Sequence, residues 1–207
     1  MKIIVESQYF PPCFLFRALI NKTHCIFEQY EPFKKTGFRN RCVIAGAEGP
    51  ITLTIPLEKG RSQKTIMKDV CIAWNENWQQ KHWRTIFYCY KSSPWFEIYS
   101  QELHDLFSKK YHYLLDWNQA CFDWISEKLS LSIQVERSLI FVPVYDIQIL
   151  DCRDSIRPKS LSLKWPHPGA YSQVFEDKTG FIPGLSILDL LFCKGKNASE
   201  ILTCQSI

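Results

Sequence analysis

The 207-residue sequence lacks the short motifs of the common cofactor-dependent enzymes. It contains no CxxC pair, no HExxH, no GxxxxGK[ST] and no GxGxxG. These absences argue against zinc hydrolases, P-loop kinases and nicotinamide-dependent enzymes, because each class uses its motif to hold a metal or a phosphate. No metal site is expected, since the five histidines are dispersed along the chain, and no cofactor is indicated.

Long apolar runs are also missing. No stretch approaches the ~18 apolar residues that a membrane-spanning helix needs. The stretch from Met1 to Val5 is too short for a signal peptide and is ended by Glu6. The nine cysteines are odd in number, and several sit inside apolar runs, which is typical of buried free thiols in a reducing compartment. We therefore expect a cytoplasmic protein with no integral membrane segment.

The charge balance is mild. The net charge is +4, from 25 basic and 21 acidic residues. A dedicated nucleic-acid binder would have a pI above ~9 and clustered basic stripes, so no nucleic-acid partner is expected. A small basic excess suits a pocket for an anionic small-molecule substrate. Aromatic residues are abundant, with 7 Trp, 9 Tyr and 14 Phe, and they either fill the core or line a sugar or nucleotide pocket.

The first half of the sequence predicts an α/β fold. Strands over 2–7 and 23–28 flank a helix over 13–20, which suggests a parallel βαβ unit. Segments 37–45 and 51–57 read as a hairpin around a five-residue loop, and 67–74 reads as a further strand. Three consecutive helices over 76–91, 94–109 and 113–129 then form a helical layer or insertion.

The second half is less regular. It contains a strand over 132–138, an ambiguous stretch over 139–150 and a loop over 151–173 that includes Pro166 and Pro168. A capping box variant over 186–189, with Asp189 as capping partner, leads into a helix that stops at Gly195. A last helix covers 199–204. No repeat or linker appears, so residues 1–207 are interpreted as one domain with a mixed sheet and a layer of several helices.

The segment Arg39-Asn40-Arg41 is the first candidate binding site. The two-residue period of a strand would place both guanidinium groups on one face, where they could clamp a diphosphate. The alternative is a solvated strand face.

A helix carries the second candidate. His82 lies on its apolar side, four residues from Trp78 and from Ile86, and could act as a general base because histidine titrates near neutrality. The alternative is a packed core histidine that is hydrogen-bonded. Lys81 could neutralise an anion at the rim of the same site.

Three further segments carry weaker candidates. Gln8 and Tyr9 follow the first strand, where α/β sheets bind ligands, and could hydrogen-bond and stack on a substrate; a rigid turn is the alternative. Tyr171 and Gln173 belong to a polar–aromatic alternation that is either a strand or a pocket wall. Cys13, just inside a helix start, is a weak candidate nucleophile.

Several of these motifs together resemble one family. They are Gln8-Tyr9-Phe10-Pro11-Pro12, Arg39-Asn40-Arg41, Trp78 with the helix from Lys81-His82 to Tyr90-Lys91, Pro94-Trp95-Phe96, Tyr171-Ser172-Gln173-Val174-Phe175, and Leu185-Ser186-Ile187-Leu188-Asp189-Leu190-Leu191-Phe192 before Gly195. The chain resembles the WbqC-like family of bacterial proteins along nearly its whole length. The resemblance implies a cytoplasmic protein linked to O-antigen, capsule or other polysaccharide gene clusters, and it carries over no reaction. Cys13 stands where the family is usually apolar or aromatic.

The leading functional hypothesis is a transferase that moves an acyl or aminoacyl group to a nucleotide-activated amino sugar. Arg39 and Arg41 would hold the diphosphate, aromatic residues would stack on the sugar or base, and His82 would free the amine. The rivals are a non-catalytic accessory protein of glycan synthesis and an amide-forming enzyme that uses Cys13 or Cys42. The leading hypothesis requires both arginines, His82 and Tyr9 to line one cleft, and it leaves the oligomeric state open.

Overall fold

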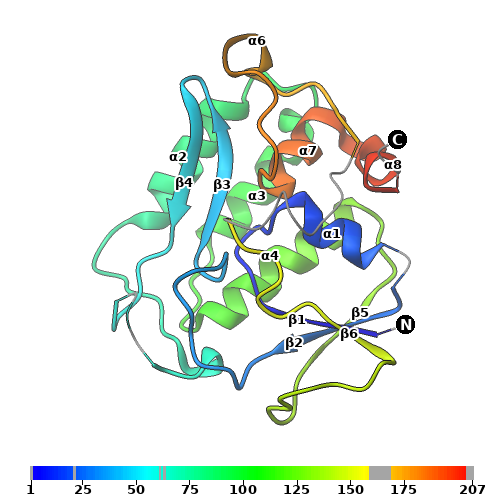
Figure 1. Cartoon of the computed structure of the whole chain (residues 1–207). Coiled ribbons are helices and arrows are strands. Elements are labelled where there is room, and N and C mark those ends of the chain that lie inside the picture. The colour runs from blue at the N-terminus through cyan, green and yellow to red at the C-terminus, as the bar shows by residue number, and fades with distance from the viewer. Residues whose placement is uncertain (1, 21, 61, 63, 159–168, 204–207) are drawn as a thin grey trace.

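A four-stranded parallel sheet forms the base of the molecule (Figure 1). The computed structural model describes residues 2–20, 22–60, 62, 64–158 and 169–203. The sheet consists of β1 (Lys2–Glu6), β2 (His24–Glu28), β5 (Gln134–Arg137) and β6 (Ile149–Asp151), in the order β5-β2-β1-β6. Helix α1 (Cys13–Leu19) connects β1 to β2, so the predicted parallel βαβ unit is confirmed. Pro166, Pro168 and Cys204, which the sequence placed in a loop and a final helix, lie outside the described residues.

The three predicted middle helices are confirmed as α2 (Trp78–Tyr90), α3 (Phe96–Ser108) and α4 (Leu114–Lys128). Helices α1 and α4 pack on the same face of the sheet, because Phe122 of α4 contacts Phe16 of α1 and Phe27 of β2, with ring centroids 5.4 and 5.1 Å apart. The α/β class is thereby confirmed. Within the described part of the chain, no helix is both long enough and apolar enough to cross a membrane.

The antiparallel pair β3 (Arg41–Gly46) and β4 (Gly49–Thr54) forms a hairpin beside α2 (Figure 1). Its connection is two residues long, not five as predicted, because Gly49 adopts a φ of 124° that lets the chain turn at once. The strand predicted over 67–74 is wrong. Met67–Asp69 form the 3-10 turn η1, and only single bridges follow, from Leu57 to Ile72 and from Cys71 to Tyr113.

The C-terminal part contains α6 (Glu176–Thr179), α7 (Ile187–Lys194), η2 (Gly195–Asn197) and α8 (Ala198–Thr203). Ser186 caps α7 as predicted, and its Oγ accepts a hydrogen bond from the Leu188 N–H at 3.3 Å. Gly195 ends the helix with a φ of 56°, and a Cβ there would lie 2.1 Å from Trp95 Cδ2. Asp189 is not a capping partner, because its buried carboxylate accepts from the Tyr90 and Tyr171 hydroxyls at 2.8 Å each.

The two faces of the central strands differ in polarity. Since successive side chains alternate, Ile3 and Val5 of β1 point into the helical core. Glu6 and Glu28 end β1 and β2, lie opposite each other in the strand register, and are both buried. Two adjacent buried carboxylates require compensating groups, and these groups define the site described next.

Candidate functional site

The candidate site lies where the strand order reverses. From β1 the chain adds β2 on one side of the sheet, and much later β6 on the other side. The carboxyl ends of such strands bracket the crevice in which open α/β sheets bind ligands. A pocket of ≈ 410 Å³ occupies this position, which we call the switch-point pocket, and it is lined by Glu31, Lys34, Phe141, Pro143, Asp151, Arg153 and Asp154.

A buried guanidinium joins the acidic residues of this pocket. Arg39 Nε donates to Glu31 Oε1 at 3.2 Å, and Arg39 Nη2 donates to Asp154 Oδ1 at 3.0 Å and also to Glu31. The Arg39 side chain has no exposed surface. Lys34, at the rim, pairs with the same two carboxylates. The charges therefore compensate one another within the protein.

Glu6 lies next to this cluster. Its Oε2 accepts from the Asp154 N–H at 2.8 Å, and its Oε1 accepts from Gln8 Nε2 at 3.0 Å. Burial raises the pKa of Glu6 to about 7, against the attraction of Arg39. Within the described part of the chain, Gln8 Oε1 has no hydrogen-bond partner, and turning the Gln8 amide over would let this oxygen accept a hydrogen bond from protonated Glu6. A carboxyl group that titrates near neutrality thus lies beside the pocket.

Arg153 fixes the wall of the pocket. Its guanidinium lies 5.5 Å from the Phe141 ring and 5.1 Å from the Tyr145 ring, and it binds Asp151 through three hydrogen bonds. It also donates to the carbonyl oxygens of Val142 and Pro143, at 2.8 and 3.1 Å. The segment between β5 and β6 is thereby held against the carboxyl end of the sheet, with Phe141 49% exposed.

The predicted arginine pair is wrong as a strand-face clamp. Arg39 and Asn40 lie in a turn before β3, and only Arg41 belongs to the strand. Arg41 donates to the Gly37 and Lys35 carbonyl oxygens, both at 2.9 Å, while Asn40 donates to the Ile55 carbonyl at 2.9 Å. The two guanidinium groups therefore have different partners and do not form a diphosphate clamp.

His82 lines a different pocket, and the buried Tyr9 contacts it from the protein interior. This His82 pocket, also ≈ 410 Å³, is lined by Thr54, Ile55, Pro56, Leu57, Gly60, Glu76, Trp78, Lys81 and His82. The Tyr9 hydroxyl lies 3.0 Å from His82 Nδ1, and the ring is also hydrogen-bonded to the Thr54 backbone. Burial lowers the pKa of His82 to about 4. A pKa so far below neutrality makes His82 a weak proton acceptor, so it is poorly suited to act as a general base.

Lys81 is an exposed residue on the rim of the His82 pocket, where it pairs with Glu76 at 2.9 Å. Neither Arg39 nor Arg41 is among the residues that line this pocket. The expected convergence of the arginines with His82 and Tyr9 on one cleft is therefore wrong, although Tyr9 and His82 contact each other.

Removal of the Tyr9 hydroxyl tests the hydrogen bond to His82. Tyr9→Phe is expected to lower the free energy of unfolding by about 1–3 kcal/mol, because His82 Nδ1 is then buried without a partner. Urea denaturation measures the change. Tyr88→Phe is the matched control, since Tyr88 is 68% exposed and should show little effect. Equal stabilities of the two variants would contradict the assignment.

Tyr171 and Gln173 lie in a third place. The Tyr171 hydroxyl donates to Asp189 at 2.8 Å. Gln173 Nε2 donates to the Ile182 carbonyl at 2.9 Å, and its Oε1 accepts from the Ile182 N–H at 2.8 Å. Both side chains are buried and bind protein groups, so they stabilise the 171–182 segment.

The cysteine hypothesis finds no support in the geometry. Cys13 and Cys42 are both buried, and burial raises the pKa of each thiol far above its ordinary range. Neither forms the accessible thiolate that a nucleophile requires.

Sequence reasoning missed the acidic residues of the switch-point pocket. One local signal was present, because each of the two predicted strands, 2–7 and 23–28, carries a glutamate at or next to its carboxyl end, at Glu6 and Glu28. Glu31, Arg153 and Asp154 gave no such signal, since their roles depend on contacts between distant segments.

Comparisons with known proteins agree with the resemblance. A profile of the WbqC-like protein family matches residues 6–147. The chain is also 24% identical over 223 residues to "Uncharacterized protein Rv1507c" from Mycobacterium tuberculosis (strain ATCC 25618 / H37Rv), covering 96% of each protein. No solved structure matches the chain.

Proposed function

Since the chain belongs to the WbqC-like protein family, we propose that it is a group-transfer enzyme of bacterial O-antigen or capsule synthesis. In this proposal the switch-point pocket binds a nucleotide-activated amino sugar, and the sugar amine receives an acyl or aminoacyl group. The supporting observation is the set of carboxylates at the carboxyl end of the parallel sheet.

The carboxylates suit an amine. Glu31, Asp151 and Asp154 line the pocket, and an ammonium group can donate to any of them. In the transfer step the neutral amine nitrogen forms a bond to the acyl carbon, and the leaving group departs with the electron pair of its bond. The surplus amine proton leaves with the departing group. Asp154 is the proposed anchor for the ammonium form of the substrate, because, against the effect of burial, Lys34 and Arg39 hold the pKa of this carboxyl below its ordinary value and keep it ionised.

The remaining pocket residues suit the rest of such a substrate. Phe141 is half-exposed and offers a ring face on which a sugar or base can stack. The Lys34 side chain, 43% exposed at the rim, offers a cation for a diphosphate. Gln8 and Arg39 would not contact the substrate but would orient Glu6 and Glu31 through hydrogen bonds. In this proposal His82 and Tyr9 are packed core residues.

A ligand screen tests the proposal. Nucleotide-linked amino sugars are expected to raise the thermal midpoint, and the same compounds with an acetylated nitrogen should raise it less. Asp154→Asn should weaken the binding of the free-amine compound about tenfold, or about 1.4 kcal/mol. Asp177→Asn, at an exposed position on α6, serves as control and should bind normally. The proposal fails if none of the amino sugars stabilises the protein.

A second candidate is the non-catalytic accessory protein. The segment between β5 and β6 exposes several large apolar side chains, among them Leu139 at 86%, Val144 at 82% and Ile147 at 102%. Exposed apolar patches of this kind are typical of protein–protein contacts. This candidate predicts that Leu139→Ser with Ile147→Ser abolishes complex formation with a glycan-synthesis enzyme, and that no amino sugar binds the switch-point pocket.

A further inference from the structure

Three segments that are far apart in the sequence meet next to the His82 pocket. The Leu57–Ile72 and Cys71–Tyr113 bridges join them side by side. The Glu58 N–H donates to the Cys71 carbonyl at 3.2 Å, and the Ile72 N–H donates to the His112 carbonyl at 2.9 Å. The backbone thus holds the residues at 58, 71 and 112 as neighbours.

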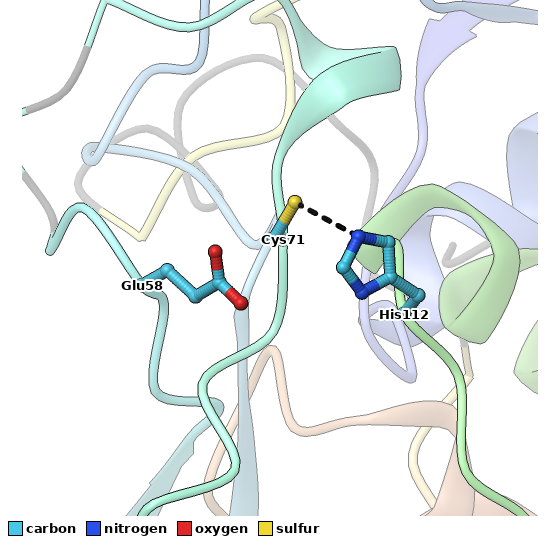
Figure 2. Close-up of side chains that lie close together, drawn as sticks. All are labelled: Glu58, Cys71 and His112. Carbon is cyan, nitrogen blue, oxygen red and sulfur yellow. Dashed lines mark hydrogen bonds between the residues drawn. The ribbon is translucent and has the colours of Figure 1, made fainter.

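The three side chains converge on one point. Figure 2 shows Glu58, Cys71 and His112 directed toward one another, and their ligand atoms all lie within 4.8 Å of each other. Cys71 Sγ is 3.5 Å from His112 Nε2. Zinc bonds of ≈ 2.3 Å to sulfur and ≈ 2.0–2.1 Å to nitrogen, at a tetrahedral angle, would separate these atoms by about 3.6 Å. The thiol and imidazole are therefore already at the spacing that zinc requires.

We propose that Glu58, Cys71 and His112 bind a Zn²⁺ ion. A thiolate, an imidazole and a carboxylate are all zinc ligands, whereas Mg²⁺ and Ca²⁺ prefer oxygen donors throughout. Glu58 needs only a change of side-chain rotamer to complete the set, since it is exposed. Three protein ligands leave a fourth tetrahedral position, which faces solvent because Glu58 and His112 are both exposed.

The position of this site suggests what the ion does. Glu58 belongs to the turn whose neighbours Leu57 and Gly60 line the His82 pocket. This turn is closed by a hydrogen bond from the Gly60 N–H to the Leu57 carbonyl at 2.9 Å. A bound ion would connect the turn to the segment before α4 and so stabilise one wall of the pocket. The site is separate from the switch-point pocket and does not depend on the proposed transferase activity.

The alternative is a thiol–imidazole hydrogen bond without a metal. The Cys71 thiol is within reach of His112 Nε2 and of the Asp69 carbonyl, each at 3.5 Å. The two interpretations differ in a measurable way, because zinc binding needs the thiolate and gives a defined stoichiometry.

Metal titration of the untagged, reduced full-length protein decides between them. One equivalent of Zn²⁺ is expected to bind in competition with a chromophoric chelator, and Co²⁺ in its place should give a thiolate-to-metal charge-transfer band. Cys71→Ser and His112→Ala should each weaken zinc binding at least about tenfold, since even the loss of an outer-shell partner costs that much. Cys71→Ser should also abolish the charge-transfer band.

Control variants separate the site from other thiols and imidazoles. Cys89→Ser replaces a half-buried cysteine and His104→Ala an exposed histidine, both outside the cluster, and they should leave zinc affinity and the cobalt band unchanged. Thermal unfolding without metal shows whether each variant is folded. If either Cys71→Ser or His112→Ala fails to fold, the zinc affinity of the other variant is compared with that of the wild type. No zinc binding by the wild type, or unchanged affinity in both Cys71→Ser and His112→Ala, would overturn the proposal.

Discussion

Replacing Arg39 with methionine is expected to lower the free energy of unfolding by about 3–5 kcal/mol. The variant keeps most of the side-chain volume but removes the cation that Glu31 and Asp154 share. Glu31 is buried and would lose that compensating partner. Urea denaturation at neutral pH measures the loss.

Arg41→Met provides the matched control, because Arg41 is two residues away and its guanidinium binds only backbone carbonyl groups among its described partners. Its loss should cost about 1 kcal/mol. Adding Glu31→Gln to Arg39→Met should recover part of the stability, since it removes one uncompensated carboxylate. Similar losses for both arginine variants would show that Arg39 is not the centre of the network.

The second large effect is a pH dependence that Glu6 introduces. Its pKa is about 7 in the folded protein, against an ordinary value of 4.5, so the folded state binds the proton more tightly than the unfolded state. The stabilisation is fully present below pH 4.5 and is lost as the pH rises through 7. A shift of this size corresponds to about 3 kcal/mol.

Comparison with Glu6→Gln isolates this contribution. His82 acts in the opposite direction, because its lowered pKa removes stability as the pH falls from 6.5 toward 4. The difference between wild type and variant cancels the His82 contribution. Relative to Glu6→Gln, the wild type should lose stability between pH 4.5 and pH 7. Glu97→Gln, exposed on α3, is the control, and stability curves for Glu6→Gln that parallel the wild type would refute the assignment.

Local patterns predicted the elements that depend on local sequence. Hydrophobic periodicity within each segment predicted the βαβ unit and the helices α2, α3 and α4. Strand β6 could not be predicted in this way, because it has three residues and forms only by pairing with β1, which is far away in the sequence. For Tyr9 and His82, the alternatives of a rigid turn and a packed core histidine match the buried contact that the two side chains make.

The candidate site residues divide in the same way. Gln8 was correctly placed at the carboxyl end of β1, since that needs only the strand assignment. Arg39 was misjudged because a sequence period cannot show that Glu31 and Asp154 surround its guanidinium. No metal site was expected because the five histidines are dispersed along the chain, and a sequence pattern cannot show that isolated bridges bring Cys71 and His112 together.

The strand order has a consequence for synthesis on the ribosome. The first βαβ unit can pair early, but the Glu6 carboxylate receives its Asp154 N–H partner from 148 residues further along the chain. Until that segment emerges, a nascent chain must keep Glu6, Glu28 and Arg39 hydrated, so the carboxyl edge of the sheet cannot close. Such distant pairing slows folding, and we expect the switch-point pocket to be among the last parts of the protein to form.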